Sequence, residues 1–417
     1  MKINGIKGVK DILPGEIEKW QWVENIAHKT FARYGFKEIR IPIFESTRLF
    51  QRSIGETTDI VEKEMYTFED KGGDSLTLRP EGTASVVRSF VEHKMYGPGQ
   101  LSKLYYIGPM FRYERPQAGR FRQFYQIGVE AMGSGNPALD AEVISMLMEF
   151  YKELGLKGLQ LNLNTLGSGE SRVRYREILK AAIKPNLSKL CENCQGRYER
   201  NPLRVLDCKN ENCGEVAVTL PKIRDNLIEE DLAHFNQVQA YLKSVNLDFI
   251  INDRLVRGLD YYGRTTFEVT AEGLGAQNAV CGGGRYDSLV EEFEGPSTPC
   301  FGFAMGLERL VSILPEEAIQ KIQSRPDVFV VMLGEQAEKA GFKLMQNLRD
   351  GGLSVTRDFE NGSMKSQLRK ANKSNCRFAV ILGENEILNK SYQLKNMETG
   401  EQSNHPPEFL LQKVSSQ

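Results

Sequence analysis

Residues 110–130 read MFRYERPQAGRFRQFYQIGVE, two alternating runs on either side of a segment with Pro and Gly at residues 115–119. This pattern is typical of an antiparallel β-hairpin. Residues of equal parity share one face of a strand, so Arg112 and Glu114 share a face of the first strand. On the second strand the same rule groups Phe124, Gln126, Gly128 and Glu130.

The chemistry of these side chains indicates what the hairpin binds. If the two faces coincide, one surface carries a guanidinium, an aromatic ring, an amide and two carboxylates. A guanidinium recognises phosphate through paired hydrogen bonds, a ring stacks on a purine, and carboxylates hold cationic groups. The mixture predicts a site for a polyphosphate nucleotide and a small zwitterion. The alternative is a charged edge hairpin exposed to water.

The chain around the hairpin alternates between helical and strand patterns. Apolar residues recur at helical spacing over residues 17–34 and 140–154, and Trp20 is expected in the core. Residues 169–231 are helical in pattern, contain cysteines and interrupt the strands, so we expect an insertion there. The strand patterns lie at residues 38–44, 64–69, 76–79, 103–112, 159–163, 265–270 and 279–282.

A separate pattern begins at Pro326. Short apolar runs typical of buried parallel strands alternate with helical patterns. The βαβαβ order predicts an α/β domain with a parallel or mixed sheet. The strand candidates are residues 328–333, 353–356 and 378–382, and the helix candidates are residues 336–349 and 364–375.

Three segments, in order along the chain, resemble the three motifs of class II aminoacyl-tRNA synthetases. Motif 1, a helix end that runs into a strand with a fixed Pro, resembles residues 35–44 (GFKEIRIPIF). Motif 2 (FRxE, a loop and RxxxF) resembles residues 111–124. Motif 3, a strand that turns into a helix with an early Arg, resembles residues 302–310 (GFAMGLERL).

Three further segments narrow the resemblance to the histidyl-tRNA synthetase family: residues 77–83 (TLRPEGT), 255–268 (LVRGLDYYGRTTFE) and 282–287 (GGGRYD). The resemblance extends from about Gly8 to the C-terminus. It implies an α+β catalytic domain, an antiparallel sheet with helices, at residues 1–325, with the helical insertion at about 169–231 inside it. The α/β domain at residues 326–417 would then bind the anticodon.

Such a family implies a two-step reaction and its substrates. The enzyme activates L-histidine with ATP to form histidyl-adenylate and pyrophosphate, and then transfers histidine to the 3′ end of tRNA(His). Family members use Mg²⁺ to neutralise the triphosphate. In class II relatives the motif 1 segment supplies the interface of a homodimer, and a two-fold pair is the commonest oligomer.

The first step joins two anions, so cations must bring them together and stabilise the attacked phosphate. By resemblance, Arg112 and Arg257 are the catalytic residues beside the α-phosphate, and Arg257 also positions the histidine carboxylate. From the residues alone, Arg257 could equally form a structural ion pair with Asp253 or Asp260, as most such neighbours do.

The resemblance completes the ATP site around Arg112. Phe124 stacks on adenine, and Arg309 lies on the other side of the base or near the γ-phosphate. Arg120 suits the γ-phosphate, and Glu114 suits the adenine amino group or a hydrated Mg²⁺. The alternative for Phe124 is a core residue, since buried aromatic rings usually serve packing.

Histidine must be distinguished from other amino acids by its imidazole, whose two nitrogens donate or accept according to tautomer. A carboxylate and a phenol can read both nitrogens, and by resemblance these are Glu130 and Tyr262. Such polar readout rejects other side chains because they leave buried groups unpaired. The remaining histidine-binding residues implied by the resemblance are Glu81, Thr83, Gln126, Arg257, Tyr261 and Tyr286.

Two cationic segments are candidate tRNA contacts. Arg115, Gln117 and Arg122 of the motif 2 loop are candidates for the acceptor end, together with Arg120. Residues 364–377 contain five cations and no acids. They contact phosphates or form a solvated helix face. A stripe at intervals of four along one helix would contain Lys365, Arg369, Lys373 and Arg377.

Composition limits the partners and the compartment. The chain has 417 residues, 40% apolar and 26% charged, and a net charge of −1, which is ordinary for a globular protein. Nucleic-acid contacts therefore need local basic patches. No run approaches the ~18–20 apolar residues that span a bilayer, so we expect a cytoplasmic protein without membrane contact.

Four of the seven cysteines form two pairs. Cys191-x2-Cys194 is followed, after thirteen residues, by Cys208-x4-Cys213. Paired thiolates at short spacing resemble a structural zinc site. The looser second spacing leaves an alternative, four reduced thiols that pack as small apolar groups. No metal ligand is assigned to the catalytic site.

Two other functions stay open at this point. One is the regulatory subunit of ATP phosphoribosyltransferase, which shares the catalytic fold, lacks the C-terminal domain and usually departs from the ATP-binding arginines. Against it stand Arg112, Arg257, Arg309 and about ninety residues after Pro326. The other is a different class II synthetase, which the segment at residues 257–262 disfavours.

Overall fold

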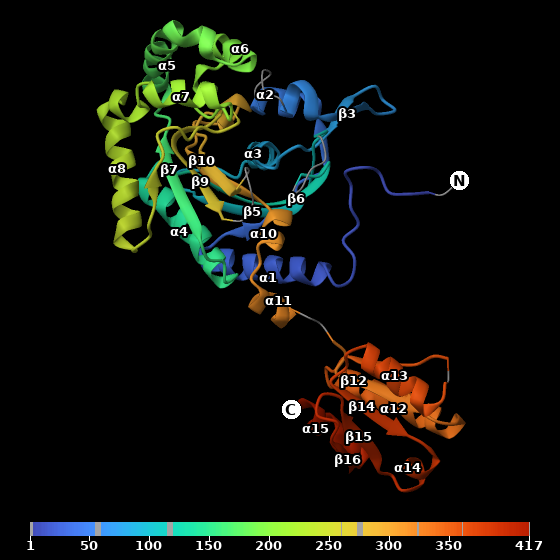
Figure 1. Ribbon diagram of the computed structural model, residues 1–417. Coiled ribbons are helices and arrows are strands. Elements are labelled where there is room, and N and C mark those ends of the chain that lie inside the picture. Colours follow the sequence, from blue (N-terminus) through green and yellow to red (C-terminus); the bar gives the residue numbers. More distant parts are fainter. Residues whose placement is uncertain are drawn as a thin grey trace. The chain divides into compact units, whose positions relative to one another are not determined.

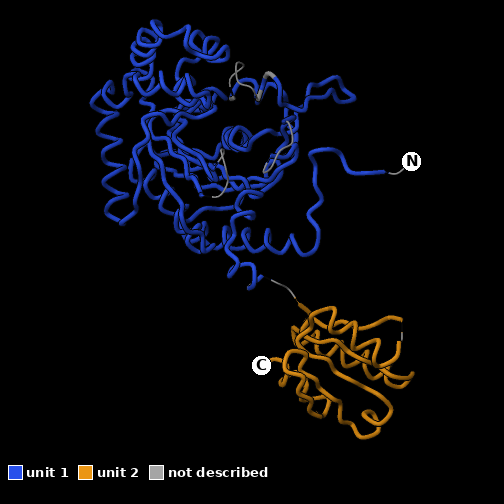
Figure 2. Tube along the Cα trace, viewed as in Figure 1, with its two compact units in different colours: residues 1–322 blue, residues 323–417 orange. Residues whose placement is uncertain are grey.

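The computed structural model describes residues 3–54, 60–114, 120–259, 261–272, 278–322, 325–360 and 362–416. The chain divides into two compact units, Met1–Ile322 and Gln323–Gln417 (Figure 2). Each unit contains a large sheet of its own. Within the described ranges, no helix has both the length and the apolar character to cross a membrane.

The first unit is built on an eight-stranded sheet in the order β1-β5-β6-β11-β10-β9-β7-β8 (Figure 1). Neighbouring strands are antiparallel except for the outer pairs, β1 with β5 and β7 with β8. The strands are β1 (Lys37–Glu38), β5 (Ser102–Phe111), β6 (Gln123–Met132), β7 (Leu159–Thr165), β8 (Ile250–Ile251), β9 (Gly263–Ala271), β10 (Ala279–Arg285) and β11 (Cys300–Gly306).

The hairpin predicted from residues 110–130 is present as β5 and β6, and its connection at 115–119 lies outside the described residues. Met110 lies opposite Phe124, so even-numbered residues of both strands share one face. The backbone N–H of Arg112 donates to the carbonyl of Arg122 (2.9 Å), which continues the pairing past β5. The two predicted faces therefore coincide.

The odd-numbered face of the sheet is covered by helices. Trp20, Phe31 and Leu147 form one buried cluster with Val129 and Phe303 of the sheet, which confirms Trp20 as a core residue. Helices α1 (Ile17–Arg33), α4 (Pro137–Glu153) and α8 (Glu229–Ser244) contribute to this cluster, together with Leu307 and Leu310 of α10 (Leu307–Ser312). The even-numbered face is thereby left for the site.

The prediction of a single strand over residues 38–44 was wrong. β1 ends at Glu38, and β2 (Phe44–Ser46) belongs to a second, three-stranded sheet. Between them, the Arg79 guanidinium donates to the carbonyls of Ile41 (2.6 Å) and Pro42 (3.1 Å). Pro42 has no N–H to continue a ladder, so the chain changes sheets there. The second sheet also contains β3 (Tyr66–Glu69) and β4 (Ser75–Leu78).

Helices fill the rest of the first unit. Between β7 and β8 the chain forms α5 (Gly169–Ile183), α6 (Glu192–Arg200) and α7 (Glu211–Thr219) before α8, with 3₁₀ turns at Lys184–Lys189, Pro202–Val205 and Ile223–Asn226. The others are α2 (Thr47–Ile54), a π-helical turn at Ile60–Glu64, α3 (Thr83–Glu92), α9 (Leu289–Glu292), α10 (Leu307–Ser312) and α11 (Glu316–Ile322).

The second unit has the mixed sheet that the βαβαβ pattern predicts. Its order is β13-β12-β14-β15-β16, with the first three strands parallel and the last two antiparallel. The strands are β12 (Val328–Met332), β13 (Val355–Arg357), β14 (Phe378–Leu382), β15 (Tyr392–Asn396) and β16 (Gln402–His405). The helices are α12 (Glu335–Asp350), α13 (Met364–Lys373), α14 (Glu384–Leu388) and α15 (Leu410–Ser415), with a 3₁₀ turn at Pro407–Phe409.

Candidate functional site

The even-numbered face of the large sheet carries a cavity of about 230 Å³. Residues of β6, β10 and β11 line it, together with the two segments that flank the undescribed loop at 115–119. The structure brings together in this cavity all the residues predicted for the ATP site and two of those predicted for histidine: Arg112, Glu114, Arg120, Phe124, Gln126, Arg257 and Arg309.

Arg112 and Phe124 form one side of the cavity. The guanidinium carbon of Arg112 lies 5.2 Å from the centroid of the Phe124 ring. Its Nε donates to the carbonyl of Pro80 (2.8 Å), which fixes the plane of the guanidinium. This hydrogen bond engages Nε alone, so the two Nη groups can meet a phosphate in the bidentate manner. Phe124 is half-buried and lines the cavity, unlike a packed core residue.

Arg257 lies across strand β10, where a glycine makes room for it. A Cβ at Gly282 would come within 2.1 Å of Nη2 of Arg257, so a larger residue would displace the guanidinium. Nη1 of Arg257 lies 3.3 Å from Oε2 of Glu268, and its guanidinium carbon lies 5.7 Å from the Tyr262 ring centroid. The cation is thus held between the cavity and the tyrosine.

The alternative in which Arg257 pairs with Asp253 was wrong. Asp253 binds Arg224, with Nε and Oδ1 2.5 Å apart, and also Lys222. Asp260, the other predicted partner, lies outside the described residues. The observed partner, Glu268, was not singled out from the sequence, although it stands at the end of the 255–268 segment.

Positive charge exceeds negative charge among the cavity residues that the structure describes. There, four guanidinium groups face three carboxyl groups, those of Glu114, Glu268 and Glu308. Glu114 pairs with Arg120 (3.0 Å), and burial raises the pKa of Glu308 to about 7. Burial, and after it the nearby Arg120, lowers the pKa of Arg309. An anion in the cavity would relieve this crowding of cations.

A buried carboxylate network adjoins the cavity. Glu130 is 1% exposed; Oε1 accepts from the Thr83 hydroxyl (2.7 Å), and Oε2 accepts from the Tyr286 hydroxyl. Burial raises the pKa of Glu130 to about 8, in spite of these two donors. Glu81 accepts from the backbone N–H groups of Thr83 (2.7 Å) and Ala84 (2.9 Å), and burial raises its pKa as well.

Three tyrosines predicted for the histidine pocket lie together beside Glu130. The ring centroids of Tyr261 and Tyr262 are 4.7 Å apart, and those of Tyr261 and Tyr286 are 5.7 Å apart. Tyr106 belongs to the same buried cluster and was missed, although it shares the even parity of Arg112 on β5. The parity rule that grouped the hairpin residues would have included it.

Glycines in β10 and β11 allow close packing in the sheet around the site. At Gly302 a Cβ would come within 2.1 Å of Oε2 of Glu130, and at Gly283 within 2.2 Å of the Gly302 carbonyl. The glycine run at residues 282–284 thus admits side chains and a neighbouring strand. Arg285, which follows the glycine run, is fully buried and forms an ion pair with Asp140 (2.7 Å), so its role is structural.

Comparison with known protein families identifies both units. The family model described as Histidyl-tRNA synthetase matches residues 8–310, and that described as Anticodon binding domain matches residues 327–417. The first match covers well over half of the chain. The chain belongs to the histidyl-tRNA synthetase family. It therefore has the class II fold, an antiparallel sheet with helices, followed by an anticodon-binding domain.

Individual relatives agree with this family. The chain is 54% identical over 404 residues to the histidine–tRNA ligase of Geobacillus sp. (strain WCH70), covering 96% of each chain. It is 51% identical over 407 residues to that of Halalkalibacterium halodurans, covering 97% of this chain and 95% of the relative. The apo crystal structure of Staphylococcus aureus histidyl-tRNA synthetase superposes with a TM-score of 0.84 at 41% identity, covering 99% and 100%.

These matches bear on the two open alternatives. A regulatory subunit of ATP phosphoribosyltransferase was expected to lack the C-terminal domain, and this chain has one that matches the anticodon-binding family. A different class II synthetase would not be half identical to histidine–tRNA ligases over nearly its whole length. Both alternatives are therefore rejected.

The structure describes some of the predicted tRNA contacts but not all of them. Arg115 and Gln117 lie outside the described residues. The guanidinium carbon of Arg122 lies 4.2 Å from the centroid of the Tyr113 ring. Arg122 directly precedes β6, one of the strands that line the cavity. The cationic stripe is shorter than predicted: Lys365, Arg369 and Lys373 lie exposed on α13, but the helix ends at Lys373.

Arg377 was wrongly included in that stripe. Asn375 has a positive φ of 54°, which turns the chain after α13 and starts β14. Arg377 instead pairs with Asp327, with Nη1 and Oδ1 2.9 Å apart. The interval of four residues was real, but it extended past the end of the helix.

Proposed function

We propose that this protein is a histidine–tRNA ligase that activates histidine with ATP and then charges tRNA(His). The observation that carries the proposal is the junction of two environments on one sheet face. A cavity rich in guanidinium groups meets a buried network of carboxyl and phenol groups, and Arg257 borders both. An adenylate-forming enzyme needs the first for a triphosphate and the second for a selected amino acid.

In the first step, a carboxylate oxygen of histidine attacks the α-phosphorus of ATP. The bond to the bridging oxygen breaks, and pyrophosphate leaves. Arg112 and Arg257 neutralise the charge that accumulates on the α-phosphate and align the carboxylate with it. Phe124 stacks on the adenine, and Arg120 and Arg309 hold the outer phosphates, where their mutual crowding favours an anion.

The buried network selects the amino acid. Glu130 and Tyr262 hydrogen-bond the two imidazole nitrogens in this proposal, which is supported by the neighbouring rings of Tyr261, Tyr262 and Tyr286. Glu81, Thr83 and Gln126 hold the α-ammonium group. A side chain without polar nitrogens would leave Glu130 buried without its ligand partner, which supports strong discrimination.

Mg²⁺ accompanies ATP in this proposal. Glu114 and Glu268 present carboxyl groups to the cavity, and carboxylate oxygens are the ligands that Mg²⁺ prefers. Once bound with ATP, the ion neutralises part of the triphosphate charge. Among the residues above, Glu114 and Glu268 are the ones that would hold it.

In the second step, a hydroxyl of the terminal ribose of tRNA attacks the histidyl carbonyl carbon, and AMP leaves. Arg115, Gln117 and Arg122 of the motif 2 loop would contact the acceptor end. Residues 326–417 would bind the anticodon, with the stripe Lys365, Arg369 and Lys373 contacting phosphates. Residues 1–325, including the insertion at about 169–231, would form the catalytic domain.

A homodimer is part of the proposal. Ile43 and Phe44, at the end of the motif 1 segment, are each about half exposed, and the Phe44 ring contacts the exposed Phe68 ring (6.5 Å between centroids). Exposed apolar side chains that adjoin one another are typical of protein interfaces. Light scattering at micromolar concentration should give twice the mass of one chain, and a monomer mass would contradict the dimer.

The function is tested by the exchange of pyrophosphate into ATP with each of the twenty amino acids in turn. We expect exchange with histidine alone, followed by charging of tRNA(His) when it is added. Exchange that depends on another amino acid would overturn the specificity. A folded protein that shows no exchange at all would overturn the ligase.

A further inference from the structure

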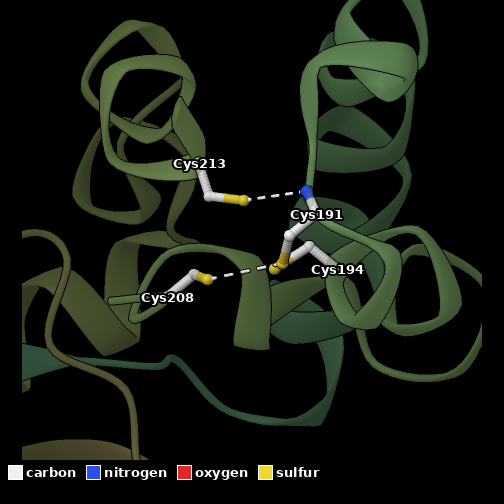
Figure 3. Close-up of side chains that lie close together, drawn as sticks. All are labelled: Cys191, Cys194, Cys208 and Cys213. Carbon is white, nitrogen blue, oxygen red and sulfur yellow. Dashed lines mark hydrogen bonds between the residues drawn. The ribbon is translucent and has the colours of Figure 1, made fainter. Parts of the chain in front are cut away.

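The four cysteines of the two pairs lie together in the helical segment between β7 and β8 (Figure 3). Cys191 caps the N-terminus of α6 and Cys194 lies in its first turn; Cys208 precedes α7 and Cys213 lies in the first turn of that helix. Two segments thus present two thiols each to one point. All four are free cysteines.

The spacing of the sulfur atoms matches one tetrahedral metal ion. A Zn–S distance of about 2.3 Å places the sulfurs of a tetrahedral site about 3.8 Å apart. The sulfurs of Cys191 and Cys208 are 3.9 Å apart, and all four lie within 4.8 Å of one another. A cubane iron–sulfur cluster would hold its cysteine sulfurs farther apart than this.

One backbone N–H group of the cluster donates to a sulfur atom. The N–H of Cys191 donates to Sγ of Cys213, with the two atoms 3.2 Å apart. Four thiolates at these distances repel one another, so a divalent cation between them supplies the missing charge.

The packing around the cysteines gives an independent argument. Helices α6 and α7 have nine residues each, which is shorter than an isolated helix needs for stability. In α6, described throughout, Cys194 is the single buried residue, and α7 buries only Cys213, Val216 and Ala217. The residues beside these helices are buried, but the helices themselves bury few side chains, and a metal ion would cross-link them.

We propose that one Zn²⁺ ion binds here as a closed structural site, with four thiolate ligands from Cys191, Cys194, Cys208 and Cys213. Zinc suits the position because a closed tetrahedral set of four cysteines has no open place for chemistry. Both spacings, with two and four intervening residues, lie within the range of structural zinc sites. The ion ties α6 to α7 and stabilises the fold of this segment.

The segment that carries the four cysteines also contacts residues on either side of Arg257. The carbonyl of Leu206 accepts from Nε of Arg254 (3.2 Å), and Arg204 donates to the carbonyl of Gly258 (3.3 Å). Loss of zinc should therefore loosen the residues on either side of Arg257 and slow histidine activation. This consequence, unlike the metal site itself, rests on the proposed function.

The first test is the metal content of the untagged protein, purified without chelator from medium that contains zinc and iron. We expect about one zinc per chain by elemental analysis. Less than about a tenth of a zinc per chain, or iron in its place, would overturn the proposal. Zinc without histidine-dependent exchange would overturn the function and keep the metal site; exchange without zinc would do the reverse.

The second test compares variants. Cys208→Ser should lose zinc, Cys208→His should retain it because imidazole is also a zinc ligand, and the matched control Cys376→Ser, in the other unit, should retain it too. Replacement by Co²⁺ should give the visible bands of tetrahedral thiolate coordination in the wild type. Equal zinc in Cys208→Ser and wild type would overturn the ligand set. If Cys208→Ser does not fold, the cobalt spectrum of the wild type decides.

Discussion

The cavity and the buried carboxylate network adjoin on one sheet face, but they hold their charges differently. The cavity arginines are half-buried and open to a ligand, whereas Glu130 and Glu81 are almost completely enclosed. A triphosphate carries its own charge, so half-buried cations suffice to attract and align it. An amino acid must be selected by its side chain. Selection needs buried polar groups, because leaving such a group without a hydrogen-bond partner costs free energy. The difference separates catalysis from specificity.

The largest effect is expected at Arg257. Changing Arg257→Ala should lower the rate of histidine-dependent pyrophosphate exchange by about 100- to 1000-fold, because one electrostatic contact to the transition state is lost. The exchange rate of Arg257→Lys should lie between those of the wild type and Arg257→Ala, since an ammonium group keeps the charge but cannot make the bidentate contact. Arg33→Ala, which removes a surface ion pair with Glu153, is the control and should change little. An unchanged rate in Arg257→Ala would make this residue structural.

The next largest effect is expected at Glu130. Glu130→Gln keeps one oxygen, which can accept from Thr83 or Tyr286 but not from both, and its amide group cannot ionise. The KM for histidine should rise by about 10- to 100-fold, because a buried polar group is left without its hydrogen-bond partner. The KM for ATP should stay within about twofold, since this change does not touch the cavity. Equal changes in both constants would break the separation; Glu149→Gln, on the exposed side of α4, is the control.

A smaller effect is expected on helix α13. Replacing Lys365, Arg369 and Lys373 together by Gln should weaken tRNA charging by about 3- to 10-fold at low salt, and should reduce its salt dependence, because phosphate contacts release counterions. Histidine-dependent exchange should not change. The paired change Lys339→Gln and Lys343→Gln on α12 is the control. Unaltered charging at every salt concentration would assign the stripe to a solvated face.

The smallest effect concerns stability against pH without ligands. The folded pKa of Glu130, about 8, lies above the ordinary value of 4.5, so its protonated form favours the folded state. That contribution is complete below pH 4.5 and is lost as pH rises through about 8. The Tm of the wild type, relative to Glu130→Gln, should therefore fall over this interval. A difference in Tm that is constant with pH would contradict the raised pKa.

The alternation of side chains along a strand was enough to predict part of the site. Parity alone placed Arg112, Phe124 and Gln126 on one face, and the register of β5 and β6 confirms it. The resemblance then supplied Arg257 and Arg309 from segments far away in the chain, which the sheet order β6-β11-β10 brings to the same cavity.

Other features depend on tertiary contacts and could not be predicted from local sequence patterns. Glu268 and Glu308 line the cavity only because β9, β10 and β11 pair as they do. The segment at 38–44 reads as one strand but divides between two sheets, because Arg79, distant in sequence, holds its carbonyls. The pattern of four that included Arg377 gave no sign of where α13 ends.

A crystal structure with ATP and histidinol tests the central claim most directly. Histidinol lacks the attacking carboxylate, so both ligands remain unreacted in the site. The account predicts the imidazole within hydrogen-bonding distance of Glu130, and the phosphates against Arg112 and Arg309, with Arg257 between the two ligands. Phosphates outside the arginine cavity, or an imidazole away from Glu130, would contradict it.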